Sequence, residues 1–243
     1  MGVDVQLKGV MKRYPNGIEA VRGVDLTFPK GQVAVVLGPS GAGKSTLLRM
    51  VNGLETATSG TIQVGDLVVH SNNHRAVRKT VGMVFQQFNL VPRLSVMANV
   101  LCGRLAHRSW VTSIFFTFPE SDFALAREAL KQVGLEDRAW DRLEKLSGGQ
   151  QQRVAIARVL VQQAKVILAD EPVASLDPET SIEVLKLLVS SARSREATLI
   201  LNLHQVDLAM QFADRIVGIR KGQVLFDGKP SDWTDTTYAQ VYQ

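Results

Sequence analysis

The order of apolar and polar residues predicts strands at the start of the chain. Residues 3–14 and 20–28 alternate between apolar and polar, as half-buried strands do. Residues 32–37, QVAVVL, form a nearly continuous apolar run, which is typical of a strand buried on both faces of a parallel sheet. A helix with apolar residues at helical spacing is predicted next, over residues 46–54, and strand-like stretches follow over 61–70 and 81–87.

Helical spacing dominates residues from about 93 to 160, most clearly over 124–135 and 153–163. Strands then alternate with helices: strands over 165–170, 197–204 and 216–228, and helices over 181–193 and 207–214. The pattern predicts an α/β fold with an antiparallel layer on the N-terminal side and an inserted helical subdomain. We expect one domain, with the core and β layer over about 1–87 and 160–243 and the helical subdomain over about 88–159.

A glycine-rich loop, GPSGAGKS, lies between a predicted strand and a predicted helix at residues 38–45. Its glycines let backbone amides turn towards a phosphate, the helix start favours negative charge, Lys44 can reach terminal phosphates and Ser45 can offer a hydroxyl to Mg²⁺. A glycine turn without chemical use is the alternative, which the flanking strand and helix disfavour. The predicted phosphate site consists of Gly38, Pro39, Ser40, Gly41, Ala42, Gly43, Lys44, Ser45 and Thr46.

Two carboxylates end the apolar strand KVILADEP at residues 165–172. Ligands of parallel α/β sheets gather at the carboxyl ends of the strands. We therefore predict that Asp170 holds Mg²⁺, directly or through water, and that Glu171 acts as general base on an attacking water. Acidic strand ends are common, so this prediction depends on the glycine-rich loop being present as well.

His204 and Gln86 each end a predicted strand and each have two interpretations. His204 is either a packed or solvated side chain, or an imidazole that senses a terminal phosphate by hydrogen bonding. Gln86 is either an ordinary loop residue or a polar group close to the nucleotide.

A second anion site is predicted in LSGGQ, residues 146–150, which starts a helix. Ser147 is a good N-cap, and Gly148 and Gly149 expose backbone amides at the positive end of the helix dipole. A nucleotide held at residues 38–45 offers only one terminal phosphate. Either the chain binds a second ligand, or this segment completes the site of another copy.

Together these residues resemble the ATP-binding subunits of ABC transporters over nearly the whole chain. The matching elements are a Walker A loop at 38–45, a Q-loop glutamine at Gln86, the signature at 146–150, a Walker B strand ending in Asp170 and Glu171, a D-loop ending in Asp177 and a switch histidine at His204. The resemblance implies a P-loop NTPase of the ABC ATPase fold, with a RecA-like core, that binds ATP and Mg²⁺.

The resemblance also implies the roles of the site residues. In that family two subunits form a head-to-tail homodimer, and each ATP lies between one Walker A loop and the partner's signature, here Ser147, Gly148, Gly149 and Gln150. Tyr14 matches the aromatic residue that stacks on adenine. The implied catalytic residues are Glu171, His204 and Gln86, and the implied metal ligands are Ser45, Gln86 and Asp170.

Within the family the chain is similar to the phosphonate-import branch, through QQFNLVPRLSVMANVLCGRL, SWVTSIFFTFPESD, residues 146–179 and LHQVD. This branch energises the uptake of phosphonate or phosphite, together with integral membrane permease subunits and a periplasmic solute-binding protein, from the cytoplasmic face of the inner membrane. In LHQVD, Gln205 stands where the wider family usually has an acid, so the histidine lacks an adjacent carboxylate to orient it.

The composition excludes several classes of protein. Apolar residues make up 45% and charged residues 21%, as in ordinary globular proteins, so a disordered or fibrous chain is not indicated. The single Cys102 excludes an internal disulfide, and no cysteine and histidine spacing suggests a structural metal. Because neither a signal peptide nor an apolar run of about 20 residues occurs, we expect a peripheral subunit at any membrane.

The positive charge is concentrated in one segment. No acidic residue lies between Asp66 and Glu120, where the bases are Arg75, Arg78, Lys79, Arg93, Arg104 and Arg108, although the whole chain has a net charge of +5. A solvated face, a nucleic-acid patch and a surface for anionic headgroups are the three interpretations. In ABC importers the segment after the Q-loop glutamine faces the membrane subunit, so we expect residues 75–108 to form a docking face.

The aromatic residues beside this segment have two interpretations as well. They either line the docking region or fill the core of the helical insertion; they are Trp110, Phe115, Phe116, Phe118 and Phe123.

Two other functions remain open for the whole chain. One is a soluble ABC-type ATPase that docks on a carbon–phosphorus lyase assembly without transport. The other is a DNA-associated ABC ATPase, which only the pI of about 9.5 suggests. Such proteins usually carry long coiled-coil insertions, which this chain lacks, so we expect no nucleic-acid partner.

Overall fold

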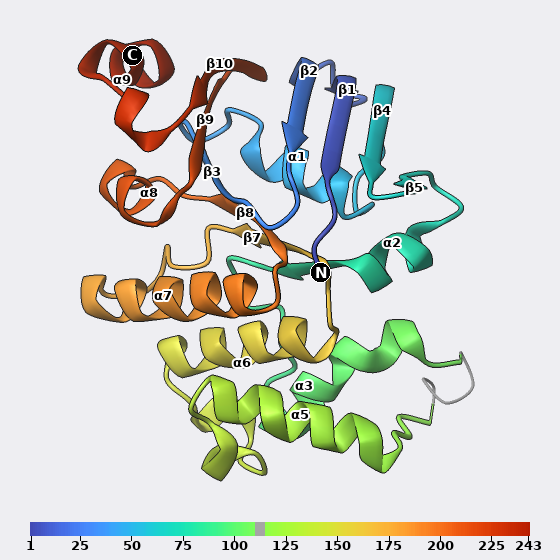
Figure 1. Ribbon diagram of the computed structural model, residues 1–243. Helices are drawn as coiled ribbons and strands as arrows, with labels where there is room; N and C mark the ends of the chain where they lie inside the picture. Colours follow the sequence, from blue (N-terminus) through green and yellow to red (C-terminus); the bar gives the residue numbers. More distant parts are fainter. Residues whose placement is uncertain (110–114) are drawn as a thin grey trace.

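A computed structural model describes residues 1–109 and 115–243 of the protein, and in this part of the chain two β-sheets lie against a set of helices (Figure 1). The larger sheet has the strand order β10 (Gln223–Gly228), β9 (Arg215–Arg220), β3 (Val33–Leu37), β8 (Thr198–Asn202), β7 (Val166–Asp170) and β6 (Val81–Val84). Its strands are parallel except β10, which is antiparallel to β9. The smaller sheet is antiparallel, in the order β2 (Glu19–Phe28), β1 (Val5–Arg13), β4 (Ser59–Val64) and β5 (Leu67–Val68).

Some helices connect strands, whereas others follow one another along the chain without a strand between them. They are α1 (Lys44–Val51), α2 (His74–Thr80), α3 (Val96–Leu101), α5 (Glu120–Gln132), α6 (Gly148–Val161), α7 (Pro178–Ser194), α8 (Val206–Phe212) and α9 (Asp235–Tyr242). Short 3-10 turns lie at η1 (Cys102–His107), η2 (Glu136–Arg138), η3 (Leu143–Lys145) and η4 (Pro230–Asp232). No helix in the described part of the chain is long and apolar enough to cross a membrane.

Strand β3 is buried on both faces, as its apolar run predicts. Val33, Val35 and Leu37 join a core that also contains residues of α3, α5, α6 and α7. Ala34 and Val36 point the other way, into a second core formed with α1 and the smaller sheet. The central strand therefore holds the two layers together, and the loop that follows it leaves from the middle of the larger sheet.

The helical insertion lies at the opposite end of the molecule from the smaller sheet (Figure 1). Helices α3, α5 and α6 pack on one another, and α6 also packs on α7, which lies nearer the larger sheet. The boundaries of about 88 and 159 for a separate subdomain stay a prediction.

Some predicted elements differ from the structure. The single strand predicted over 61–70 is wrong: the chain turns at Gly65, which has φ +56, and forms β4 and β5. The strand predicted to end at His204 ends at Asn202, and the strand predicted to run to Gln86 ends at Val84. Both polar residues therefore lie on loops beyond the carboxyl edge of the sheet.

Candidate functional site

The loop from Gly38 to Ser45, called here the phosphate loop, connects β3 to α1. Gly38 and Gly43 are required by close packing, because an added Cβ would lie 2.0 Å from the Ile219 carbonyl oxygen and 2.2 Å from that of Ala20. Gly41 has φ +77, and open space surrounds the position of a Cβ there. The loop therefore presents an uncovered concave backbone at the start of a helix, which suits phosphate oxygens.

Lys44 lies inside this loop and is only 4% exposed. Its Nζ donates to the carbonyl oxygens of Gly38 at 2.8 Å and Pro39 at 3.1 Å. Burial lowers the pKa of Lys44, and the carboxylates of Glu171 and Asp170 oppose this effect. The ammonium group is thus held near the loop backbone and faces two acids across the site.

Two oxygen groups suited to a magnesium ion meet at the end of β7. Ser45 Oγ donates to Asp170 Oδ1 at 2.7 Å, and Asn202 Nδ2 donates to the same oxygen at 2.8 Å. A cavity of about 440 Å³ is lined by Ser45, Asp170 and Gln86. Mg²⁺ is usually held by one or two carboxylates together with waters and substrate phosphates, and a hydroxyl beside one carboxylate fits that coordination.

Glu171 and His204 form a close pair at the same edge of the sheet. Glu171 Oε1 lies 2.6 Å from His204 Nε2, and the glutamate backbone has φ +50, a conformation uncommon for a residue with a side chain. The sequence suggested that Gln205 leaves the histidine without an adjacent carboxylate. Glu171, which directly follows the neighbouring strand β7, supplies that carboxylate, because β7 and β8 are paired in parallel register.

A second cavity, of about 290 Å³, joins Glu171 to the phosphate loop. Its lining consists of Ala20, Glu171 and the loop and helix residues Ser40, Gly41, Ala42, Gly43, Lys44, Ser45 and Thr46. Every member of the predicted phosphate site from Ser40 to Thr46 therefore borders one space, which also contains the predicted general base.

Tyr14 lies just beyond β1, near the start of α1. Its hydroxyl is 3.4 Å from Thr46 Oγ1, and the ammonium group of Lys12 lies 4.9 Å from the centre of its ring. The ring is thus close to the phosphate loop, and Lys12 covers part of it.

The signature segment, Ser147 to Gln150, starts α6. Ser147 Oγ accepts from the Gln150 amide at 3.3 Å, and Gln150 Oε1 accepts from the Ser147 amide at 3.0 Å, so the helix begins with a complete capping box. Ser147 and Gly148 are exposed. Among the described residues no hydrogen bond or ion pair joins this segment to the phosphate loop.

Asp177 is the N-cap of α7, where its Oδ1 accepts from the Thr180 amide at 3.0 Å. This hydrogen bond lowers the pKa of Asp177. The exposed aspartate therefore has a local structural role besides the one that the family resemblance implies.

Sequence analysis missed two polar residues of this region. Asn202, the last residue of β8, is fully buried and fixes Asp170. Arg158, in α6, donates to the carbonyl oxygens of Asn89 at 2.5 Å and Phe88 at 3.1 Å. In both cases the available signal was a single polar residue in an otherwise apolar stretch.

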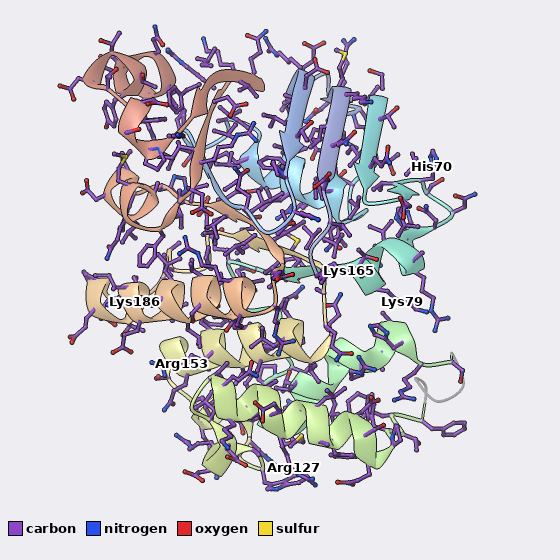
Figure 2. The ribbon with its side chains drawn as sticks, viewed as in Figure 1. His70, Lys79, Arg127, Arg153, Lys165 and Lys186 are labelled. Atoms are coloured by element: carbon purple, nitrogen blue, oxygen red, sulfur yellow. The ribbon has the colours of Figure 1, made fainter. Side chains whose placement is uncertain are left out.

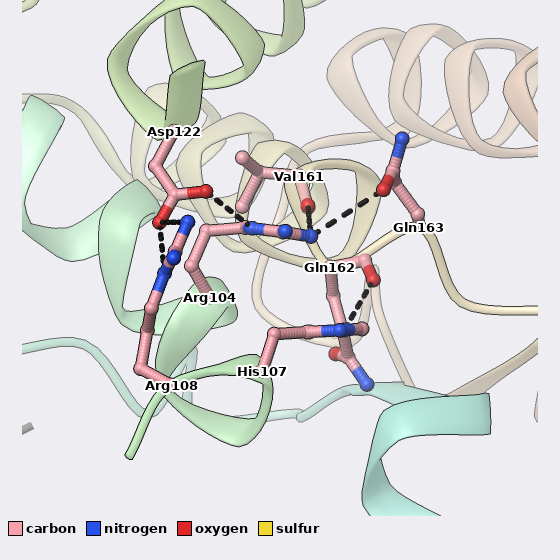
Figure 3. Close-up of polar contacts among 7 residues, drawn as sticks. All are labelled: Arg104, His107, Arg108, Asp122, Val161, Gln162 and Gln163. Carbon is pink, nitrogen blue, oxygen red and sulfur yellow. Dashed lines mark hydrogen bonds and ion pairs between the residues drawn. The ribbon is translucent and has the colours of Figure 1, made fainter. Parts of the chain in front are cut away.

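The predicted basic docking face needs correction, because two of its arginines are ion-paired within the helical half. Figure 3 shows Arg104 and Arg108 on either side of Asp122. Arg104 Nε donates to Asp122 Oδ1 at 2.9 Å and Arg108 to Oδ2 at 2.6 Å. We call these three residues the Asp122 cluster. Arg104 also donates to the Val161 carbonyl at 3.2 Å, so it ties η1 and α5 to the end of α6.

The other bases of the segment are on the surface. Arg75, Arg78 and Lys79 belong to α2 and are exposed, as is Arg93. In Figure 2 the side chain of Lys79 extends from the outer side of α2. A smaller basic surface, around α2, thus replaces the predicted one.

The aromatic cluster divides in the structure. Phe118 and Phe123 pack against the larger core, which agrees with the core interpretation, whereas Phe115 is 75% exposed. Phe116 meets Phe118 edge to face at 4.9 Å. Trp110 lies outside the described residues.

Comparison with known proteins decides the family. The family model described as "ABC transporter" matches residues 21–174. The chain belongs to the ABC transporter family. The predictions of this family, of its ATPase fold and of an ATP-hydrolysing subunit are therefore confirmed.

Similar proteins are known at the level of both sequence and structure. The chain is 56% identical to a phosphonates import ATP-binding protein of Thiobacillus denitrificans, covering 98% of this chain and 92% of that protein, and 49% identical to one of Trichodesmium erythraeum, covering 98% and 93%. It resembles the structure of cbiO1 from Clostridium perfringens, part of an ABC transporter complex, with TM-score 0.84, 29% identity and coverage of 99% and 94%. It also resembles a dimeric ATP-binding cassette in a post-hydrolysis state bound to ADP and Pi, with TM-score 0.82, 33% identity and coverage of 94% and 100%.

Proposed function

We propose that the chain hydrolyses ATP beside its phosphate loop to energise the uptake of phosphonate or phosphite by an ABC importer. The observation that carries the proposal is the meeting, at one edge of the sheet, of the Ser45–Asp170 contact and the Glu171–His204 contact. The names of relatives about half identical over nearly the whole chain support the substrate class.

The binding half of the site holds the phosphates. Backbone amides of the phosphate loop and the start of α1 face the phosphate oxygens, and Lys44 supplies a positive charge. Ser45, Asp170 and Gln86 hold Mg²⁺, and Asn202 fixes the orientation of the aspartate. When bound, Mg²⁺ neutralises part of the charge on the phosphate oxygens.

The hydrolytic half of the site positions water. Glu171 borders the same cavity as the phosphate loop, so its carboxylate can accept a proton from a water placed there. His204, at hydrogen-bonding distance, fixes the carboxylate and senses the terminal phosphate. Most of the rate acceleration comes from positioning and from charge stabilisation, as in other phosphoryl transfers.

A second copy of the chain completes each site. The backbone amides of Gly148 and Gly149, at the helix start that Ser147 and Gln150 cap, suit the terminal phosphate of an ATP bound to the partner, in a head-to-tail homodimer. Asp177 lies beside that interface, and Tyr14 stacks on the adenine. The dimeric structure of a solved relative at 33% identity, bound to ADP and Pi, supports the formation of a dimer.

The subunit works at the cytoplasmic face of the inner membrane, as a peripheral partner of permease subunits that act with a periplasmic solute-binding protein. A groove of about 220 Å³ offers a place for the permease, with a lining from α2, β6, η1 and α6 that includes Arg78, Phe85, Cys102 and Arg158. The exposed bases of α2 beside it favour anionic headgroups. Isolating the complex and identifying its membrane and solute-binding components would test the transport role and its substrate.

The variant Glu171→Gln tests the catalytic assignment. It should bind ATP and dimerise while losing hydrolysis by about a hundredfold or more, the usual contribution of a general base. ATP binding, the oligomeric state and phosphate release would be measured on the same purified protein. Glu136→Gln, an exposed change in η2, is the control and should keep full activity. Near-normal turnover of Glu171→Gln would refute the assignment.

A further inference from the structure

Arg158 lies in α6, and no carboxylate among the described residues forms an ion pair with it. Its Nη1 donates to the Asn89 carbonyl oxygen at 2.5 Å, and its Nη2 donates to that of Phe88 at 3.1 Å. Burial lowers the pKa of its guanidinium, and the nearby Cys102 opposes this effect. Removing a guanidinium from water costs free energy, which two neutral carbonyl acceptors only partly offset. This cost indicates that holding the segment has a function.

The segment held by Arg158 is unusual in its backbone. Phe88 and Asn89 have φ +46 and +54, so two consecutive residues with side chains adopt the left-handed conformation. Such residues persist where surrounding contacts enforce them, often at functional sites. Gln86, which lines the cavity with Ser45 and Asp170, is only two residues before Phe88.

The ring of Phe88, in the same segment, lies beside the start of α6. A methyl group at Gly148 would lie 3.9 Å from Phe88 Cζ, so the phenylalanine ring borders the signature segment. Gly148 and Arg158 are separated by about 15 Å along the helix at its rise per residue. The hydrogen bonds from Arg158, together with a ring beside Gly148 at that separation, restrict rotation of the segment relative to the helix more than the hydrogen bonds alone would.

We infer that Arg158 is a positioning residue that makes the segment carrying Gln86 move together with the signature helix. The inference rests on the proposed role of Gln86 and goes beyond it. In a head-to-tail dimer Gln86 serves the nucleotide of its own chain, whereas the signature segment serves the partner's nucleotide. Arg158 therefore connects the two nucleotide sites of the dimer within one chain.

Arg158→Lys tests the inference with little loss of packing. Lysine keeps the charge and the long stem but cannot hold two carbonyls in the fixed fork of a guanidinium. We expect kcat for ATP hydrolysis to fall about tenfold, the scale of a hydrogen bond to a charged group, with KM for ATP and the melting temperature little changed. Amides of residues 87–91 should exchange hydrogen faster than in the wild type.

The control is Arg195→Lys, because Arg195 also donates to a backbone carbonyl, that of Leu160 at 3.0 Å, and burial also lowers its pKa. It does not touch the segment after Gln86, so its kcat should stay at the wild-type value.

A double-mutant cycle separates positioning from general destabilisation. If Arg158 acts through Gln86, Arg158→Lys should have little further effect on kcat in a Gln86→Ala background. The inference would be overturned if the losses of kcat in the two single variants added up in the double variant. It would also be overturned if Arg158→Lys changed neither kcat nor amide hydrogen exchange. Phe88→Ala, which removes the ring at Gly148, enters the same cycle and keeps the test decisive if the arginine variant does not fold.

Failure of the inference differs from failure of the proposed function. In the first case the wild type hydrolyses ATP, Glu171→Gln does not, and Arg158→Lys behaves as the wild type. In the second case the wild type shows no turnover or Glu171→Gln retains it.

Discussion

Asp122 balances two positive charges inside the helical half. It is fully buried, and Arg104 and Arg108 reach its two oxygens from η1 and the loop after it. Burial raises the pKa of Asp122, but the hydrogen bonds from Arg108 and Arg104 outweigh this effect and hold the pKa below its ordinary value. The carboxylate is therefore ionised at neutral pH, and it provides the counter-charge for the two arginines.

Asp122→Asn should reduce the free energy of unfolding by about 3 kcal/mol at neutral pH, because it leaves a buried arginine without a counter-charge. The folded-state pKa of the acid is depressed, so its contribution is complete above the unfolded value of about 3.9 and is lost as the pH falls through the folded-state value. Urea unfolding measured at pH 7 and at progressively lower pH checks both statements. The difference in the free energy of unfolding between wild type and variant should become smaller as the pH falls.

The control for Asp122→Asn is Asp141→Asn, which removes a more exposed pair with Arg138. This change should cost less than about 1 kcal/mol. Equal losses in the two variants would show that burial of the Asp122 cluster does not decide its contribution.

Residues that act within one local motif could be predicted from the sequence, and residues whose partners come from other elements could not. Lys44 and Ser45 follow from the spacing of the glycine-rich loop. The carboxylate of His204 could not be found this way, because Glu171 reaches it through the pairing of β7 with β8. Asp122, the partner of Arg104, also lies outside the acid-free segment that contains this arginine.

The start of α6 packs directly on the start of α7. A methyl group at Gly149 would lie 2.6 Å from Thr180 Cγ2, so glycine is required there by a side chain of the neighbouring helix. The signature segment and the Asp177 cap of α7 are therefore fixed to each other, although no motif joins them in the sequence.

Gly149→Ala should destabilise the protein by about 1 kcal/mol, because overpacking costs about 1–3 kcal/mol and the gain in helix propensity returns at most about 1 kcal/mol. Thr180→Ser removes the methyl group concerned, so the double variant should recover the loss in thermal unfolding. If Gly149→Ala is equally destabilising with serine at position 180, the contact with Thr180 is not its cause.

Among the elements, long apolar patterns were predicted reliably and short polar helices were not. The strand predicted over 165–170 appears as β7, because a short apolar run between polar residues suits a strand buried on both faces. Helix α2, HRAVRKT, buries only Val77, and α9 buries only Thr237 and Val241. Such helices lack an apolar stripe, and their existence depends on the surface that receives them.

At the scale of the molecule, the two predicted anion sites belong to different ends of the structure. The phosphate loop follows β3 near the smaller sheet, and the signature segment begins α6 in the helical half (Figure 1). Each has exposed residues: Ser40 and Gly41 in the phosphate loop, and Ser147 and Gly148 in the signature segment. Under the proposed function, one chain thus carries two halves of a site that do not meet in it, which is the geometry that a head-to-tail dimer requires.

Mixing two inactive variants tests that geometry directly. Ser147→Arg blocks the signature segment and keeps the phosphate loop, whereas Lys44→Ala weakens the phosphate loop and keeps the signature segment. Each homodimer should be inactive. A mixed dimer has one intact site of two, and half of random pairs are mixed. An equal mixture should therefore recover up to about a quarter of the wild-type ATPase rate.

A mixture of Ser147→Arg with the double variant Ser147→Arg/Lys44→Ala contains no intact site and should stay inactive. If each chain instead completed its own site, no mixture would recover activity, and the head-to-tail dimer would be wrong.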